Sequence, residues 1–173
     1  MAAKLDLYVV RHAAAEDAPS GMPDAHRALT AKGREKFRKT ARKLAAKVRS
    51  IDLIFTSPLV RAVQTAEILA GEVAHEAVSV LPALAGHPAQ EVLDAIEGMR
   101  GDHASVALVG HEPQVTELLA RSLQLPPDQA AAIQFRKGAV VLVEIGGASA
   151  AEPRWWIRGG GFHPGLPGGT DDD

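Results

Sequence analysis

The sequence contains no cysteine, which excludes a disulfide framework and zinc sites built from thiolates. Aromatic residues make up only 4% of the chain, so its core must be built mainly from alanine, valine, leucine and isoleucine. The N-terminal stretch MAAKLDLYVVRH has a short apolar run that ends at Arg11. We interpret it as a buried strand, not a signal peptide or a membrane span. We therefore expect a cytoplasmic protein with no membrane partner.

The length and overall composition are those of one compact domain. Hydrophobic residues make up 46% and charged residues 23% of the 173 residues, which is ordinary globular usage. From Gly159 onward the sequence reads GGGFHPGLPGGTDDD, the composition of a flexible chain end. We expect a single domain over residues 1–158 and a Gly/Pro/Asp-rich flexible tail over residues 159–173.

Positive charge is concentrated in one segment, although the net charge is only −2. Nine of the 19 Lys and Arg residues lie between Lys32 and Arg49, against one acidic residue, Glu35. The simplest interpretation is a solvated helix face, and the alternative is a basic surface that attracts an anionic partner. Phe37 is the single aromatic residue among these charges and no nucleic-acid motif is present, so we expect no nucleic-acid partner.

Apolar runs alternate along the chain with segments of helical periodicity. The run Leu5–Val10 is typical of a strand buried on both faces. Thr30 is a suitable N-cap for one helix, and Ser57-Pro58 has the composition of another helix start. The expected strands are 5–10, 52–56, 78–81, 105–109, 138–145 and 154–157, and the expected helices are 31–48, 58–71, 90–99 and 113–122. This alternation predicts an α/β three-layer sandwich with a mostly parallel central sheet flanked by helices.

Reactive side chains follow three of the expected strands. The first strand ends at Arg11-His12, the second at Ser57 with Arg61 one helical turn later, and the fourth at His111. Parallel strands bring such ends to one edge of a sheet, where α/β proteins bind their ligands. The result is an anion site with two histidines, two arginines and a helix N-terminus.

These residue types indicate phosphoryl transfer. Arginine presents bidentate donors that match phosphate oxygens, and it keeps its charge at working pH. A neutral imidazole is a competent nucleophile toward phosphorus. Arginines and a second, protonated histidine would stabilise the transferring group, so the scheme requires no metal and no cofactor.

Four stretches of the sequence carry a resemblance to a known family. LYVVRHAAAE, HRALTAKGREK, TSPLVRAVQTAEIL and LVGHEP occur in this order over residues 5–113. Together they resemble the motifs of the histidine phosphatase superfamily, which is phosphoglycerate mutase-like in fold. The short chain is similar to the SixA-like phosphohistidine phosphatase branch. The resemblance implies a phosphatase that forms a covalent intermediate on His12.

The same resemblance assigns roles to the other residues. It implies that Arg11, Arg61 and His111 form the phosphate pocket. Ser57, at the same sheet edge, is a further candidate for phosphate binding. Arg27 is a further candidate for contact with phosphate or substrate from the long loop. The implied partner is a phosphohistidine-bearing protein or a small phosphorylated metabolite.

Two positions depart from the family pattern. Ala13 stands where glycine is usual, so the backbone there must avoid a glycine-only conformation. Leu81-Pro82-Ala83-Leu84 lacks the carboxylate expected of an L-P-E-L pattern. The substitutes for this proton donor are His87, Glu16, Asp17 and Glu112.

The missing carboxylate bears on the substrate. An alkoxide leaving group needs a proton in the transition state, whereas an imidazole, whose conjugate acid has a pKa of about 6.5, needs less help. We therefore favour phosphohistidine in a protein over a small phosphomonoester. Two further alternatives remain open: a non-catalytic phosphate-binding module, and a metal hydrolase with His12, His111 and His87 or His103 as ligands.

Overall fold

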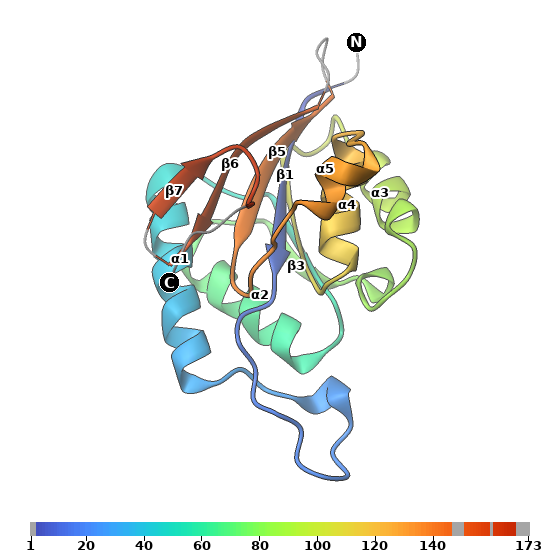
Figure 1. Cartoon of the computed structure of the whole chain (residues 1–173). Coiled ribbons are helices and arrows are strands. Elements are labelled where there is room, and N and C mark those ends of the chain that lie inside the picture. The colour runs from blue at the N-terminus through green and yellow to red at the C-terminus, as the bar shows by residue number, and fades with distance from the viewer. Residues whose placement is uncertain (1–2, 147–150, 160, 169–173) are drawn as a thin grey trace.

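The computed structural model describes residues 3–146, 151–159 and 161–168. Within these ranges seven strands form one sheet in the order β3-β2-β4-β1-β5-β6-β7 (Figure 1). The strands are β1 (Leu5–Arg11), β2 (Leu53–Thr56), β3 (Ala77–Val80), β4 (Ser105–Gly110), β5 (Val140–Ile145), β6 (Glu152–Arg158) and β7 (Gly161–Pro164). The helices are α1 (Ala31–Lys47), α2 (Val60–Glu72), α3 (Ala89–Glu97), α4 (Gln114–Ser122) and α5 (Pro127–Ala131), with 3-10 turns at Asp24–His26 and Pro82–Leu84.

The sheet is mixed. Strands β3, β2, β4 and β1 pair in parallel, whereas β5, β6 and β7 pair antiparallel to their neighbours. The connections from β5 to β6 and from β6 to β7 are too short for a parallel crossover, so these two pairs are antiparallel. The expected α/β sandwich is confirmed, with its parallel part confined to the first four strands.

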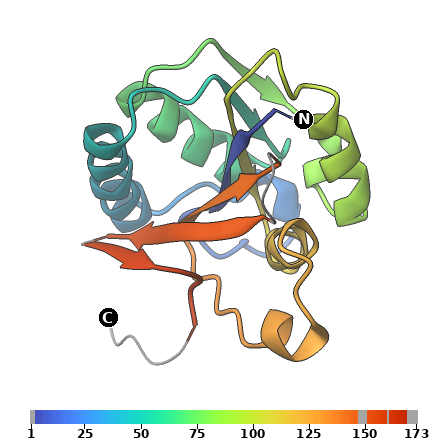
Figure 2. The same cartoon turned by 90° about the horizontal axis from the view of Figure 1, so that it is seen from above.

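Helices cover both faces of the sheet and complete three layers. Helices α1 and α2 lie on one face, and α3 and α4 lie on the other (Figure 2). Alternate residues of β1 enter two separate cores: Tyr8 and Val10 pack with α1 and α2, and Leu7 and Val9 pack with α3 and α4. Burial on both faces accounts for the continuous apolar run of this strand.

The start of α1 agrees with the sequence-based expectation, and the start of α2 does not. The Thr30 side chain accepts a hydrogen bond from the Gly33 amide at 2.8 Å, so Thr30 caps α1 as predicted. Helix α2 begins at Val60, not at Pro58. The Ser57 hydroxyl instead accepts a hydrogen bond from the Leu59 amide at 3.2 Å and contacts His111. Helix α5 has no counterpart in the sequence-based expectation, because its five residues are too few to show a helical period.

The expectation of a flexible tail from Gly159 is wrong for residues 161–164. These residues form β7, which pairs with β6. Phe162 packs edge-on against Trp155, and His163 stacks on Trp156 at a centroid separation of 4.3 Å. These ring contacts stabilise β7 although the surrounding sequence is rich in glycine. The end of the expected tail, residues 169–173, lies outside the described residues.

None of the helices within the described ranges has the length and apolar content needed to cross a membrane.

The contact between α1 and the loop after β1 depends on a glycine. A Cβ atom added at Gly33 would overlap the carbonyl oxygen of Ala14, which also accepts from the Thr30 amide at 3.0 Å. We expect Gly33→Ala to lower the free energy of unfolding by about 1–3 kcal/mol, because the loop must move away from the helix.

Gly71→Ala is the matched control, because a Cβ atom at Gly71 in α2 meets nothing within 4 Å. It should raise stability by up to about 1 kcal/mol, the difference in helix propensity. Chemical denaturation of both variants measures the two effects. Equal changes would show that Gly33 has no packing role.

Candidate active site

The sequence-predicted residues meet at the carboxyl ends of three adjacent strands. His12 follows β1, His111 follows β4, and Ser57 follows β2, in a sheet where β4 lies between the other two. The imidazole rings of His12 and His111 have centroids 5.0 Å apart and are tilted by 49°. The strand-end argument therefore places the two histidines together, as predicted.

His12 is held with one ring nitrogen directed at the backbone. Its side chain is buried, and Nδ1 lies 2.7 Å from the carbonyl oxygen of Ala13. A carbonyl oxygen only accepts, so Nδ1 carries the proton and donates. In the neutral ring, Nε2 then has a free lone pair. The structure thus determines which nitrogen of His12 is able to act as a nucleophile.

The backbone after His12 is tied to α2. The Ala13 amide donates to Oγ1 of Thr65 at 3.1 Å, and the Thr65 hydroxyl donates to the Arg61 carbonyl oxygen at 2.7 Å. Sequence reasoning missed Thr65, because a buried threonine within a helix resembles an ordinary packing residue. Ala13 needs no glycine-like conformation: within the described ranges, Gln124 is the only non-glycine residue with positive φ.

His111 is joined to Ser57. Its Nε2 lies 2.8 Å from the Ser57 hydroxyl oxygen, and Ser57 is fully buried. The same hydroxyl accepts from the Leu59 amide, which orients it at the start of α2. The serine therefore anchors the second histidine, which explains why it does not serve as the helix cap.

Both histidines are neutral at physiological pH. Burial lowers the pKa of His12 to about 3, with a smaller contribution from His111 and the two arginines, while the Ala13 carbonyl opposes the shift. Burial also lowers the pKa of His111 to about 4, with Arg61 adding to the effect and Asp24 opposing it. The protonated second histidine of the sequence-based scheme thus requires a nearby anion, whose charge would raise the pKa of His111.

Arg61 extends from the first turn of α2 and is buried. Its Nη1 donates to the carbonyl oxygen of Asp24 at 3.0 Å, and its Nη2 donates to the Asp24 carboxylate at 2.9 Å. Arg27 donates to the other oxygen of that carboxylate at 2.8 Å. These contacts, that of Arg27 first, hold the pKa of Asp24 below its usual value. Arg27 therefore contacts the site through Asp24, a residue that sequence reasoning missed.

Arg11 approaches from β1 and donates through Nη1 to the carbonyl oxygen of Phe135. Burial lowers its pKa, and the charge of Glu112 opposes that shift. Among the described residues, three buried nitrogens of this site have no hydrogen-bond partner: Nε of Arg11, Nε of Arg61 and Nδ1 of His111.

Of the four candidate proton donors, His87 and Glu112 contact other side chains. His87 forms an exposed ion pair with Glu91 at 2.9 Å. The Glu112 carboxylate accepts from the Thr116 hydroxyl at 2.8 Å. Glu16 contributes a backbone oxygen to Arg27, and Asp17 is exposed in the same loop. No contact recorded within the described ranges joins any of the four to His12 or His111.

The described residues give little support to the metal-hydrolase alternative. The described part of the chain holds no group of three or more His, Asp or Glu side chains arranged to bind a metal ion. His103 lies 3.5 Å from Glu76, away from the histidine pair.

Comparison with known proteins identifies the family. Residues 7–86 match the model of the histidine phosphatase superfamily, branch 1. An uncharacterized protein of Picosynechococcus is 35% identical over 115 residues, which cover 65% of this chain and 70% of that protein. The chain belongs to branch 1 of the histidine phosphatase superfamily, whose members are phosphatases and mutases.

Within that class the structure is similar to SixA phosphohistidine phosphatases. A protein assigned as SixA from Agrobacterium tumefaciens has a TM-score of 0.77 at 21% identity, over 88% of this chain and 97% of that one. SixA in complex with tungstate has a TM-score of 0.76 at 24% identity, over 89% and 97%. A protein assigned as SixA from Nakamurella multipartitia has a TM-score of 0.72 at 25% identity, over 94% and 98%.

Burial of two neutral histidines makes stability depend on pH. Their pKa values in the folded protein lie below the value of about 6.5 expected in the unfolded chain, so the unfolded state takes up protons first as the pH falls. Stability is therefore lost from about pH 6.5 downward. For His12 we expect this to cost about 2 kcal/mol between pH 7 and pH 5.

Unfolding of the wild type and of His12→Gln at the two pH values measures that cost, and the variant should lose less stability. NMR of the imidazole ring gives a second readout, because His12 should not titrate between pH 8 and pH 5. Equal losses in both proteins, together with a ring that titrates near pH 6.5, would contradict the assigned burial effect.

Proposed function

We propose that this protein is a metal-independent phosphatase that transfers a phosphoryl group to Nε2 of His12 and then to water, with phosphohistidine in a protein as its substrate. The observation that carries the proposal is the 2.7 Å hydrogen bond between Nδ1 of His12 and the Ala13 carbonyl oxygen. It leaves the Nε2 lone pair free beside His111 and near two arginines.

The first step forms the covalent intermediate. The Nε2 lone pair attacks phosphorus, and the bond from phosphorus to the substrate's imidazole nitrogen breaks. The bonding electrons remain on the departing imidazole, which leaves as a neutral ring because its other nitrogen already carries a proton. The phosphorylated His12 ring gains positive charge, which its hydrogen bond to the Ala13 oxygen stabilises.

The second step returns the enzyme to its starting state. A water oxygen bonds to phosphorus as the bond between phosphorus and Nε2 breaks, and the electron pair returns to Nε2. Phosphate leaves with the water oxygen. The Nδ1 proton stays in place throughout, so His12 begins each cycle in the same tautomer.

The surrounding cations supply the electrostatic stabilisation. Arg11 and Arg61 each retain a buried Nε donor without a partner, and His111 retains a ring nitrogen in the same condition, within the described ranges. A phosphoryl group among these donors would satisfy them and offset its own charge. Its charge would also raise the pKa of His111 toward protonation.

The leaving group favours phosphohistidine over an alkyl phosphate. Ala83 occupies the place of the expected carboxylate and lies in a 3-10 turn, where its carbonyl oxygen accepts from Gln114 at 2.7 Å. An imidazole leaves without the strong protonation that an alkoxide needs. A small phosphomonoester is therefore the second candidate substrate.

Trapping of the intermediate tests the proposal. Incubation of the wild type with radiolabelled phosphoramidate, followed by rapid quenching in alkali, should yield an acid-labile label on His12. His12→Ala should give no label, and His87→Ala, which changes an exposed histidine, should label as the wild type does. Absence of label in the wild type would favour a passive phosphate-binding module.

Comparison of substrates tests the leaving-group argument. Turnover of a phosphohistidine-bearing protein domain should exceed that of para-nitrophenyl and alkyl phosphates under the same conditions. His12→Ala serves as the background in each assay. Faster hydrolysis of alkyl phosphomonoesters would assign the enzyme to small-molecule substrates.

Asp24 provides a separate prediction. Its carboxylate neutralises part of the Arg61 charge, so it opposes the arrival of an anion. We expect Asp24→Asn to tighten the binding of inorganic phosphate by about two- to tenfold, since one opposing charge is removed. Calorimetric titration measures the dissociation constant.

Asp17→Asn is the matched control, because it removes the same charge from an exposed position of the same loop. It should change phosphate binding by less than about twofold. Weaker binding in Asp24→Asn would show instead that Asp24 orients Arg61 for the phosphoryl group.

A further inference from the structure

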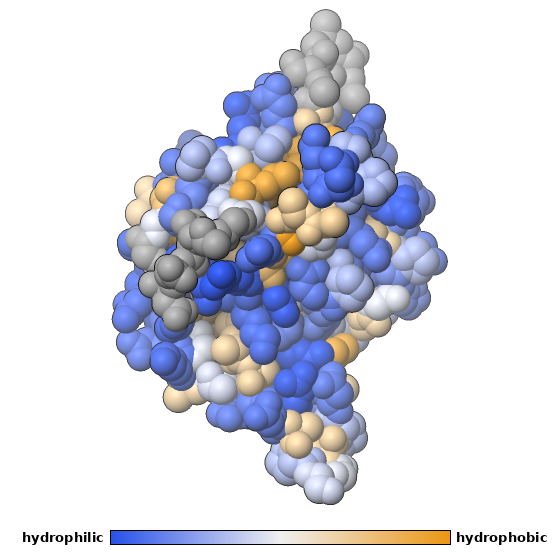
Figure 3. Space-filling model, in the orientation of Figure 1, coloured by the Kyte–Doolittle hydropathy of each residue, from blue (hydrophilic) through white to orange (hydrophobic). Residues whose placement is uncertain are grey.

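A basic groove lies beside the candidate active site, between α1 and the ends of β5 and β6. Its volume is about 620 Å³. One end is formed by Ala13 and Ala14, the two residues that follow His12. The histidines and arginines of the candidate active site do not line it. The visible face that includes this part of the molecule is mainly hydrophilic (Figure 3).

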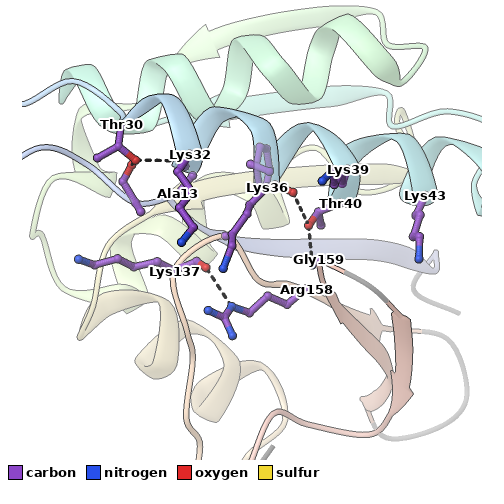
Figure 4. A pocket seen from close by; sticks show the side chains of 14 residues that line it. Ala13, Thr30, Lys32, Lys36, Lys39, Thr40, Lys43, Lys137, Arg158 and Gly159 are labelled. Carbon is purple, nitrogen blue, oxygen red and sulfur yellow. Dashed lines mark hydrogen bonds between the residues drawn. The ribbon is translucent and has the colours of Figure 1, made fainter. Parts of the chain in front are cut away.

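Six cationic side chains line the groove, and none of its lining residues is acidic. They are Lys32, Lys36, Lys39 and Lys43 from α1, and Lys137 and Arg158 from the opposite wall (Figure 4). The α1 residues recur at intervals of three or four positions, so they share one helix face over about 16 Å. Cations therefore approach the same space from two sides.

Most of this charge is not neutralised within the protein. Lys39 pairs with Glu35 at 3.0 Å. Across the described ranges, Lys32, Lys36, Lys137 and Arg158 belong to no ion pair. Like charges repel when they are gathered around one concave space, and a bound polyanion relieves that repulsion.

The groove has defined walls. The Thr40 hydroxyl accepts from the Gly159 amide at 2.8 Å, which joins the middle of α1 to the chain after β6. Arg158 donates through Nε to the Lys137 carbonyl oxygen at 3.3 Å, which orients its guanidinium. Figure 4 shows the Lys32 and Lys36 side chains extending from α1 toward this guanidinium. These contacts hold the two charged walls a fixed distance apart.

We propose that this groove binds a chain of phosphates, as carried by inorganic polyphosphate or a nucleoside triphosphate. Linked phosphates place several negative charges in a row, which matches the row of lysines on α1. The Lys ammonium groups and the Arg158 guanidinium are suitable phosphate donors. A volume of this size suits a small ligand better than the surface of a folded protein. The site is distinct from His12, so it does not depend on the proposed phosphatase activity.

Calorimetric titration of the full chain with inorganic tripolyphosphate tests the proposal. Lys36→Glu and Arg158→Glu should each weaken binding by about tenfold or more, because an attractive charge in the groove becomes repulsive. Arg38→Glu is the matched control: it makes the same charge change at an exposed position of α1 outside the groove, and it should change binding by less than about threefold.

Arg61→Ala separates the groove from the candidate active site. Binding of tripolyphosphate should persist in that variant within about threefold, because Arg61 does not line the groove. Adenosine triphosphate and adenosine form the next pair of ligands. Tighter binding of the nucleotide than of tripolyphosphate would identify a nucleoside triphosphate as the ligand, and the reverse order would identify inorganic polyphosphate.

Four results would overturn the proposal. The first is equal weakening by Arg38→Glu and Lys36→Glu, which would reflect net charge alone. The second is loss of binding in Arg61→Ala with retention in Lys36→Glu, which would place the anion at the candidate active site. The third is tighter binding of a hexa-aspartate peptide, which would indicate an acidic protein partner. The fourth is binding that occurs only after residues 169–173 are removed, which would make the chain's own aspartates the occupant.

Discussion

The hydrogen bond from Nδ1 of His12 to the Ala13 carbonyl oxygen is the interaction on which the candidate active site depends. It assigns the ring proton to Nδ1 and leaves Nε2 with the free lone pair. Burial keeps the ring neutral, since a charged imidazole there would lose its hydration. The Ala13 amide is in turn bound by Thr65, so the orientation of His12 relies on α2 as well as on β1.

The topology of the sheet explains why cations gather around this ring. Strands β2, β4 and β1 are neighbours and parallel, so Ser57, His111 and His12 emerge at one edge. Helix α2 begins at the same edge and brings Arg61. Burial lowers the pKa of both histidines, and the positive potential gathered at this edge lowers it further. Asp24 offsets part of that potential by its contacts with Arg61, which makes the loop before α1 part of the electrostatic balance.

The sequence was sufficient to predict the α/β sandwich and the meeting of the two histidines, because burial patterns and strand ends follow local rules. The contacts of Asp24 with Arg61 and of Thr65 with Ala13 were not predictable. They join residues 37 and 52 positions apart, and they depend on how a loop and a helix pack. The start of α2 was misplaced because Ser57 contacts His111, a partner far along the chain. Strand β7 was missed because its pairing with β6 and the stacking of His163 on Trp156 outweigh a glycine-rich composition.

The missing carboxylate and the low pKa of His111 both concern protonation of the leaving group. With a pKa lowered to about 4 by burial, His111 is neutral at physiological pH and cannot protonate a leaving group. A phosphoryl dianion beside it would raise its pKa, so in the proposed function binding of the substrate would be accompanied by uptake of a proton at His111. That proton stabilises the negative charge of the transferring group. An imidazolium donor suits an imidazole leaving group far better than an alkoxide. In the proposed function, a site that has His111 in place of the carboxylate therefore favours phosphohistidine as the substrate.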